Sequence, residues 1–175
     1  MIVFRNTDVD VPFLWDSDRQ PAARWHGTGD GPAQYTATTP DAAWAEFLRH
    51  NGIADAGDLA GIQRTMWAVE IPDVEPTGAP ILPAETLTGG LASYPECQAE
   101  AARLRAGGLS RLVAISAAVM PGKPSGWVSA PDLRPAPARE EQTIVLFGVR
   151  PDLVGWVSAT LGRPEPTLLK RVRHL

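Results

Sequence analysis

Cysteine is almost absent from the sequence, because Cys97 is the only one among 175 residues. A single cysteine cannot form a disulfide within the chain, so we expect the protein to work in the reducing environment of the cytoplasm. No apolar run approaches the roughly 18 residues that a helix needs to cross a bilayer. The first residues also lack the basic segment and apolar run of a secretory signal peptide. The sequence therefore predicts a cytoplasmic protein that does not enter a membrane.

An excess of basic residues is missing too. The chain has 16 Lys and Arg against 20 Asp and Glu, which gives a formal net charge of −4. Nucleic acids and anionic membranes are bound through basic faces, so we expect neither as a direct partner. Hydrophobic residues make up 44% of the chain and charged residues 21%, as in folded rather than disordered proteins. Because no linker or internal repeat divides the chain, we expect one domain spanning residues 1–175.

Short runs rich in apolar and β-branched residues predict strands. These runs are residues 1–5, 33–39, 64–72, 110–116, 143–149 and 153–161. Two segments carry the signals of a helix: residues 40–51 after an N-capping Thr39, and residues 97–108 after a capping box of Ser93 and Glu96. Strands mixed with only two helices predict an α+β fold with mixed or antiparallel sheets and not a regular βαβ winding.

Several motifs suggest other chemistries without their usual context. The glycines of residues 27–31 have no strand before them and no helix after them, so they predict a tight turn and not a dinucleotide fingerprint. The aspartates of residues 8–18 lack the glycine and glutamate of an EF-hand loop, so we expect no metal site. No G-x-S-x-G elbow marks Ser116 as a hydrolase nucleophile. Cys97 lies in a predicted helix, where we expect an inert buried thiol.

Arg24, Tyr35 and Glu46 follow one another at equal steps along the chain. Each has an ordinary interpretation by itself. Arg24 can stack on the neighbouring tryptophan, Tyr35 can be a half-buried strand residue, and Glu46 can form a helical ion pair with Arg49. Ser116 can be a plain hydroxyl at the end of a strand. The spacing alone leaves open whether these residues are unrelated or converge on one ligand.

Taken together, these residues resemble the RES-domain family, which is named for an arginine, a glutamate and a serine. The first block of the family appears here as Arg5 in "VFRN", followed by "ARWH", "QYTATTPDAAWAE" and "EFLRH". A later block appears as "GLSRLVAISAAV", which assigns the family serine to Ser116, and the strand "IVLFG" is similar too. The resemblance covers roughly residues 2–150. The chain departs from the family at Ile115, where many members have proline, and in the length of the proline-rich residues 121–139.

The resemblance implies an ADP-ribosyltransferase-like fold and an enzyme that consumes NAD as its substrate. Family activities include NAD phosphorolysis with inorganic phosphate as co-substrate, NAD hydrolysis, and ADP-ribose transfer to proteins, none of which calls for a metal. Many members are toxins of toxin–antitoxin operons, held inactive by an Xre-type helix-turn-helix antitoxin. The alternative is a non-catalytic binding module with the same fold. Residues 121–139, expected as a loop or arm, and the basic tail, residues 170–174, expected to be exposed, would serve such a module.

The resemblance also implies roles for five residues. Glu46 would stabilise the positive charge that develops on the ribose as nicotinamide leaves. Arg24 would clamp the pyrophosphate through its planar guanidinium, with help from Arg5. Tyr35 would stack on the nicotinamide or donate its hydroxyl to the ribose. Ser116 would hydrogen-bond the ribose or orient the carboxylate.

Overall fold

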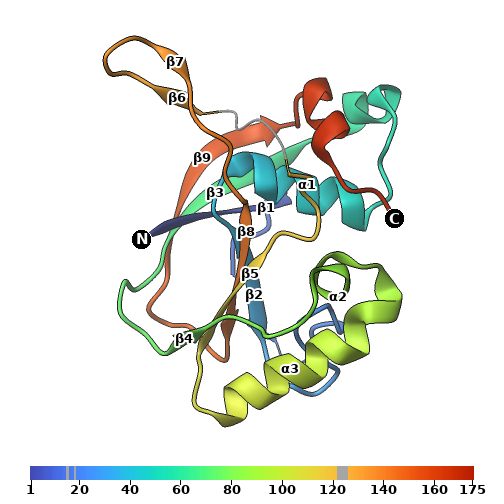
Figure 1. Cartoon of the computed structure of the whole chain (residues 1–175), viewed down its shortest axis with the longest axis vertical. Helices are drawn as coiled ribbons and strands as arrows, with labels where there is room; N and C mark the ends of the chain where they lie inside the picture. The colour runs from blue at the N-terminus through green and yellow to red at the C-terminus, as the bar shows by residue number, and fades with distance from the viewer. Residues whose placement is uncertain (15, 18, 122–125) are drawn as a thin grey trace.

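A mixed seven-stranded sheet forms the centre of the protein, in the order β4-β5-β8-β2-β1-β3-β9 (Figure 1). The computed structural model describes residues 1–14, 16–17, 19–121 and 126–175. The strands are β1 (Ile2–Asp8), β2 (Ala33–Ala37), β3 (Arg64–Glu70), β4 (Thr77–Gly78), β5 (Arg111–Ile115), β8 (Gln142–Phe147) and β9 (Val154–Gly162). β4 and β5 are parallel, whereas the other neighbours are antiparallel. The predicted α+β class is confirmed, and it is consistent with an ADP-ribosyltransferase-like fold.

The first helix, α1 (Pro40–His50), begins as its sequence predicts. The hydroxyl of Thr39 accepts the backbone N–H of Ala42 at 3.1 Å. Thr39 has the extended backbone of an N-cap residue, and Pro40 and Asp41 occupy the first turn. All of these signals are local, which is why they identify the start of the helix correctly.

The second predicted helix exists, but its predicted capping box is wrong. α3 (Tyr94–Ala106) begins before Cys97, and the Ser93 side chain makes no capping hydrogen bond. The Ser93 backbone is already helical, whereas a capping residue needs an extended backbone. The reason is the 3-10 turn η2 (Leu91–Ser93), which leads directly into α3. The hydroxyl of Ser93 instead donates to Gly90 O at 2.8 Å.

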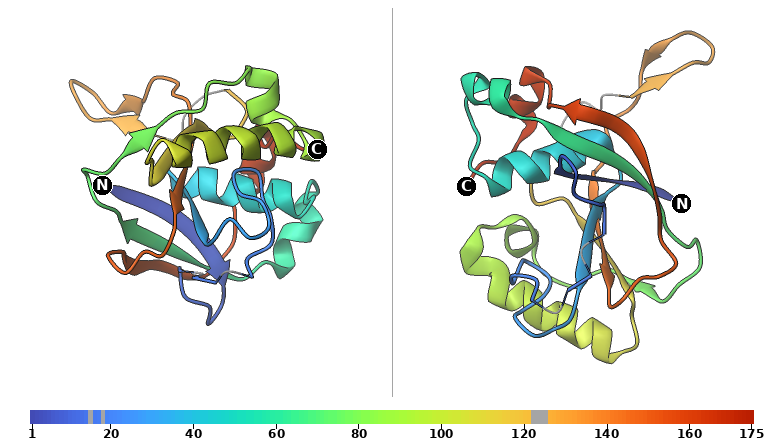
Figure 2. Two further views of the ribbon diagram at one scale, coloured as in Figure 1. Left: turned by 90° about the horizontal axis from the view of Figure 1, so that it is seen from below. Right: turned by 180° about the vertical axis from the view of Figure 1, so that it is seen from behind.

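Other short helices lie in segments without a sequence signal of their own. They are η1 (Ala56–Gly61), α2 (Ala84–Thr88) and η3 (Pro166–Arg171). α2 lies beside α3, on the same side of the molecule (Figures 1 and 2). Within the described ranges, no helix has the length and apolar character needed to cross a bilayer.

α1 and α3 cover the same face of the sheet (Figures 1 and 2). Alternate residues of a strand share a face, so Ala33, Tyr35 and Ala37 all point toward the helices. Ala37 packs in one buried cluster with Trp44 of α1, and Ala33 packs in another with Cys97 of α3. Tyr35 therefore points from the sheet toward the region between the two helices.

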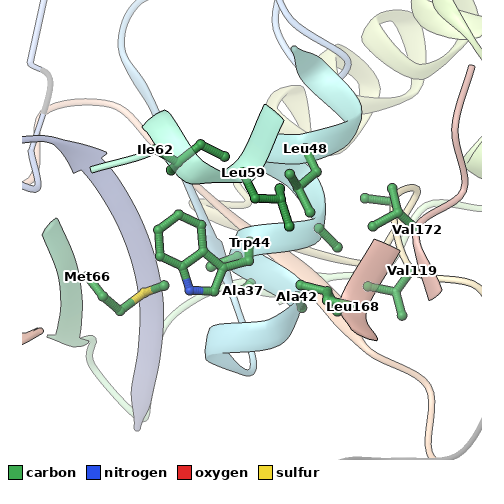
Figure 3. Close-up of a cluster of buried hydrophobic side chains, with 13 residues drawn as sticks. Ala37, Ala42, Trp44, Leu48, Leu59, Ile62, Met66, Val119, Leu168 and Val172 are labelled. Atoms are coloured by element: carbon green, nitrogen blue, oxygen red, sulfur yellow. The ribbon is translucent and has the colours of Figure 1, made fainter. Parts of the chain in front are cut away.

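Buried side chains hold both faces of the sheet in place. On the helical face, Figure 3 shows the indole of Trp44 near Met66 and Leu59. On the opposite face, Val3 and Ile144 belong to a separate buried cluster. Cys97 is fully buried and unpaired, as predicted for a packed thiol.

Residues 121–139 lie partly outside the described chain, because residues 122–125 are not described. The remainder forms the two-stranded pair of β6 (Trp127–Val128) and β7 (Arg134–Pro135), which projects from the body of the protein (Figure 1). The side chains of Trp127 and Leu133 are exposed on this projection. The described part of residues 121–139 therefore contains a two-stranded projection.

The predicted exposure of the basic tail, residues 170–174, is wrong in part. Val172 is buried and bridges to Val119, in the segment after β5. The backbone N–H of Arg173 donates to Ala118 O at 2.7 Å, next to this bridge. The tail packs because an apolar residue between its cations enters the α1 cluster.

Candidate functional site

Glu46 is held by two hydroxyl groups, one from the residue that follows β5 and one from β8. Ser116, directly after β5, donates to Glu46 Oε1 at 2.8 Å, and Thr143 of β8 donates to the same oxygen at 2.9 Å. Two donors on one oxygen fix the orientation of the carboxylate. Within the described part of the chain, no group bonds Glu46 Oε2, which leaves that oxygen available to a ligand.

Ser116 is fixed in turn by its own backbone. Its hydroxyl accepts the N–H groups of Ala118 and Val119 at 3.2 and 3.3 Å, while its N–H donates to Glu141 O at 2.8 Å. The side chain is buried and cannot rotate freely without losing these bonds. Ser116 therefore orients Glu46, one of the two roles expected for it.

The hydroxyl of Tyr35 is already engaged within the protein. It accepts the backbone N–H of Trp25 at 2.9 Å and lies 3.0 Å from His26 Nδ1. The tautomer of His26 decides which of these two groups donates in the second contact. Burial raises the pKa of Tyr35 above its ordinary value. The half-buried ring is the part of Tyr35 that remains for contact with a ligand.

Arg24 is buried and links the turn after residue 23 to the segment between α2 and α3. Its Nη1 donates to Ser93 Oγ at 2.9 Å and to Thr86 O at 3.2 Å, and its Nη2 donates to Gly89 O at 2.5 Å. The guanidinium also lies 4.9 Å from the ring centroid of Tyr94. No carboxylate forms an ion pair with Arg24 within the described ranges, so its charge is not neutralised locally.

Arg49 is a second buried cation that sequence reasoning missed as a site residue. Its Nη1 donates to Ala117 O and Arg173 O at 2.7 Å, and its Nη2 donates to Thr88 O and Gly89 O at 3.0 and 2.6 Å. The helical ion pair with Glu46 is not formed, because these carbonyls occupy the terminal nitrogens. Burial lowers the pKa of Arg49, and the charge of Arg24 lowers it further.

The two arginines meet at one carbonyl, that of Gly89, which accepts from both of them. A side chain at this position has no room, since a Cβ on Gly89 would lie 2.8 Å from Glu85 O and 3.0 Å from Ser93 Oγ. The close approach makes glycine necessary there. Arg24 and Arg49 thereby hold the segment after α2 against α1 and α3.

Arg5 is not brought together with the other predicted residues. It lies on β1 opposite Trp67, and its Nη1 donates to Gln34 Oε1 at 2.5 Å. Gln34 is the neighbour of Tyr35 on β2, so its side chain points to the opposite face of the sheet. Burial, with the charge of Arg64, lowers the pKa of Arg5 to about 10. The structure thus separates Arg5 from Glu46 by the thickness of the sheet.

Two other sequence interpretations concern turns and metals. Residues 27–31 form a turn, in which Gly29 and Gly31 have φ values of +85° and +83° that favour glycine. Among the described residues, no group of three or more His, Cys, Asp or Glu is arranged to hold a metal ion. Residue 18 of the aspartate-rich segment 8–18 lies outside the described chain.

The His26–Tyr35 pair predicts a pH-dependent stability. Burial lowers the pKa of His26; Asp30 raises it, and Arg105 lowers it. In the unfolded chain His26 has the ordinary histidine pKa of about 6.5. As the pH falls, the unfolded chain therefore takes up this proton before the folded protein does. The stability that neutral His26 contributes is therefore complete above about pH 6.5 and is lost as the pH falls through the folded value. Between pH 7.5 and pH 5 we expect the free energy of unfolding, measured with urea, to fall more steeply in wild type than in His26→Gln. Equal slopes in the two proteins would contradict this prediction.

A family model, that of the RES domain, matches residues 9–158 of the chain. This range contains Arg24, Tyr35, Glu46 and Ser116, whereas Arg5 precedes it and η3 and the basic tail follow it. No curated protein matches the sequence.

Proposed function

Since this chain belongs to the RES domain family, we propose that it consumes NAD by breaking the bond between nicotinamide and ribose. The family is associated with toxin–antitoxin systems and with NAD. The proposed acceptor is inorganic phosphate or water, which makes the protein an NAD phosphorylase or an NAD glycohydrolase. The observation that carries the proposal is the fixed carboxylate of Glu46, with one oxygen held by two hydroxyls and the other available.

The chemistry of the bond explains why such a carboxylate is useful. Neutral nicotinamide leaves as positive charge builds on the ribose, so a nearby negative charge stabilises the transition state more than the bound substrate. Glu46 Oε2 would accept a ribose hydroxyl or face the developing charge. Because Ser116 and Thr143 already hold Oε1, the carboxylate needs no reorganisation during the reaction.

The neighbouring side chains have matching roles in the proposal. The ring of Tyr35 would stack on the nicotinamide, because its hydroxyl is engaged with Trp25 and His26. Arg24 would act on the dinucleotide through its charge, since its terminal nitrogens donate to protein acceptors in the unliganded protein. Arg5 has no part in this site, because it lies on the far face of the sheet.

The proposal extends to a partner. A protein that depletes NAD harms its own cell, so we propose that it is a toxin held inactive by an Xre-type helix-turn-helix antitoxin. The exposed Trp127 and Leu133 on the β6–β7 projection support contact with another protein. They equally favour the second candidate function, transfer of ADP-ribose to a protein acceptor.

The test is an analysis of products by mass spectrometry. Purified protein is incubated with NAD, with and without inorganic phosphate, beside a Glu46→Gln control. We expect nicotinamide from the wild-type protein, together with ADP-ribose 1″-phosphate if phosphate is the acceptor or free ADP-ribose if water is. Nicotinamide that forms only when a candidate protein acceptor is added would identify a transferase. Absence of nicotinamide under all three conditions would contradict the proposal.

A further inference from the structure

A cavity of about 430 Å³ opens where the end of α1 meets the segment after α2 and the basic tail. Arg49, Thr88, Gly89 and Arg173 are among the residues that line it. The lining does not include Arg24, Tyr35, Glu46 or Ser116. The cavity nevertheless adjoins the candidate site, because Arg49 follows Glu46 by one turn of α1. The cavity is largely open to solvent, so a dissolved ion can reach it.

The lining of the cavity combines two arginines with the apolar side chains of Leu91 and Leu175, and no Asp or Glu belongs to it. It includes Arg49, Arg173 and His174. Neither arginine forms an ion pair with Asp or Glu within the described ranges. The two guanidinium groups make this lining locally cationic in a protein whose formal net charge is −4. Such a cavity attracts anions.

The two arginines differ in what they can offer to an anion. All four terminal N–H groups of Arg49 donate to backbone carbonyls, so this residue supplies a fixed charge. Arg173 donates one long hydrogen bond, from Nη1 to Thr88 Oγ1 at 3.3 Å. Its Nε is buried without a partner among the described residues. An unpartnered buried donor is unfavourable, and rotation of the side chain toward a phosphate would give it an acceptor.

We propose that this cavity binds a phosphoryl group through Arg173, beside the fixed charge of Arg49. The guanidinium suits phosphate because its planar fork offers two parallel N–H donors. The phosphoryl group would belong to the NAD pyrophosphate or to the phosphate co-substrate, an identification that rests on the proposed function. Arg173 lies beyond the matched residues 9–158, whereas Arg49 and Gly89 lie within them.

Direct binding tests the site without any need for catalysis. Titration calorimetry with pyrophosphate, and separately with inorganic phosphate, compares wild type with Arg173→Gln and Lys170→Gln. Lys170 is an exposed cation of the same tail and does not line the cavity. We expect Arg173→Gln to weaken the binding of at least one probe by about 10- to 100-fold, whereas Lys170→Gln changes it less than about twofold. Equal binding by wild type and Arg173→Gln, or no binding by wild type, would overturn the proposal.

The Arg173→Gln protein should fold, because the tail bonds through its backbone at this position. Arg173 N donates to Ala118 O, and Arg173 O accepts from Arg49, both at 2.7 Å. A thermal melt of each variant checks this expectation. Arg173→Lys, which keeps the charge without the fork, should bind with intermediate affinity.

Kinetics then identify the phosphoryl group and separate this inference from the proposed function. If the pyrophosphate binds here, Arg173→Gln raises the KM for NAD with little change in kcat; if the co-substrate binds here, it raises the KM for phosphate instead. If pyrophosphate binding depends on Arg173 but the protein does not consume NAD, the inferred site is supported and the proposed function is contradicted. If Arg173→Gln consumes NAD with unchanged KM values for NAD and for phosphate, the inferred site is contradicted and the proposed function is supported.

Discussion

Glu46→Gln is expected to lower the kcat of nicotinamide release by about 10²- to 10³-fold. The amide has nearly the size of the carboxylate, and its oxygen can still accept from Ser116 and Thr143. The negative charge is lost, and with it the stabilisation of the charge that develops on the ribose. We therefore expect the loss in kcat, with a melting temperature close to that of wild type. Nicotinamide release under saturating NAD measures the effect.

Two controls make this expectation specific. Glu165→Gln removes the charge of an exposed carboxylate at the start of η3, and we expect wild-type kcat. Thr143→Val removes one of the two donors to Glu46 with almost no change in shape, so we expect a smaller loss, of about tenfold. A Glu46→Gln protein as active as Glu165→Gln would exclude Glu46 from the reaction.

The sequence predicted best those features that depend on neighbours along the chain. The start of α1 was identified by Thr39, and the turn at residues 27–31 by its glycines, because each acts within a few residues. The capping box at Ser93 failed because its backbone conformation is set by the preceding turn η2. Ser93 and Glu96 have the residue types of a capping box, but Ser93 does not have the extended backbone that a capping residue needs.

Among the residues of the candidate site, too, the sequence identified some and missed or misplaced others. The family pattern placed Glu46 and Ser116 in one site, and in the structure a hydrogen bond of 2.8 Å joins these two side chains. Arg49 carried no signal, because its partners are backbone carbonyls, which every residue possesses. Arg5 was attributed to the site from its place in a motif. Successive side chains of a strand point to alternate faces of the sheet, and the pairing of β1 with β2 therefore places the Arg5 side chain on the face opposite Glu46.

Arg49→Ala is expected to be the most destabilising substitution near the site. The change removes four hydrogen bonds that join α1 to three other segments, at Ala117, Arg173 and residues 88–89. Each buried carbonyl that loses its donor costs about 1–3 kcal/mol, and water entering through the cavity recovers part of this cost. We expect a net loss of about 3–5 kcal/mol in the free energy of unfolding, measured by urea denaturation.

The control for this loss is Arg103→Ala, the same substitution at an arginine that is itself 58% exposed and pairs with the buried carboxylate of Glu100. Glu100 keeps its hydrogen bond from the backbone N–H of Ile81, and water reaches the exposed position of Arg103, so we expect Arg103→Ala to change stability far less than Arg49→Ala. Arg49→Lys should fall between the two, since one ammonium has three donors and cannot span four carbonyls. Equal stability of Arg49→Ala and Arg103→Ala would mean that the four bonds do not hold the segments together. The positions of Glu46 and the cavity would then have to depend on apolar packing around Trp44 alone.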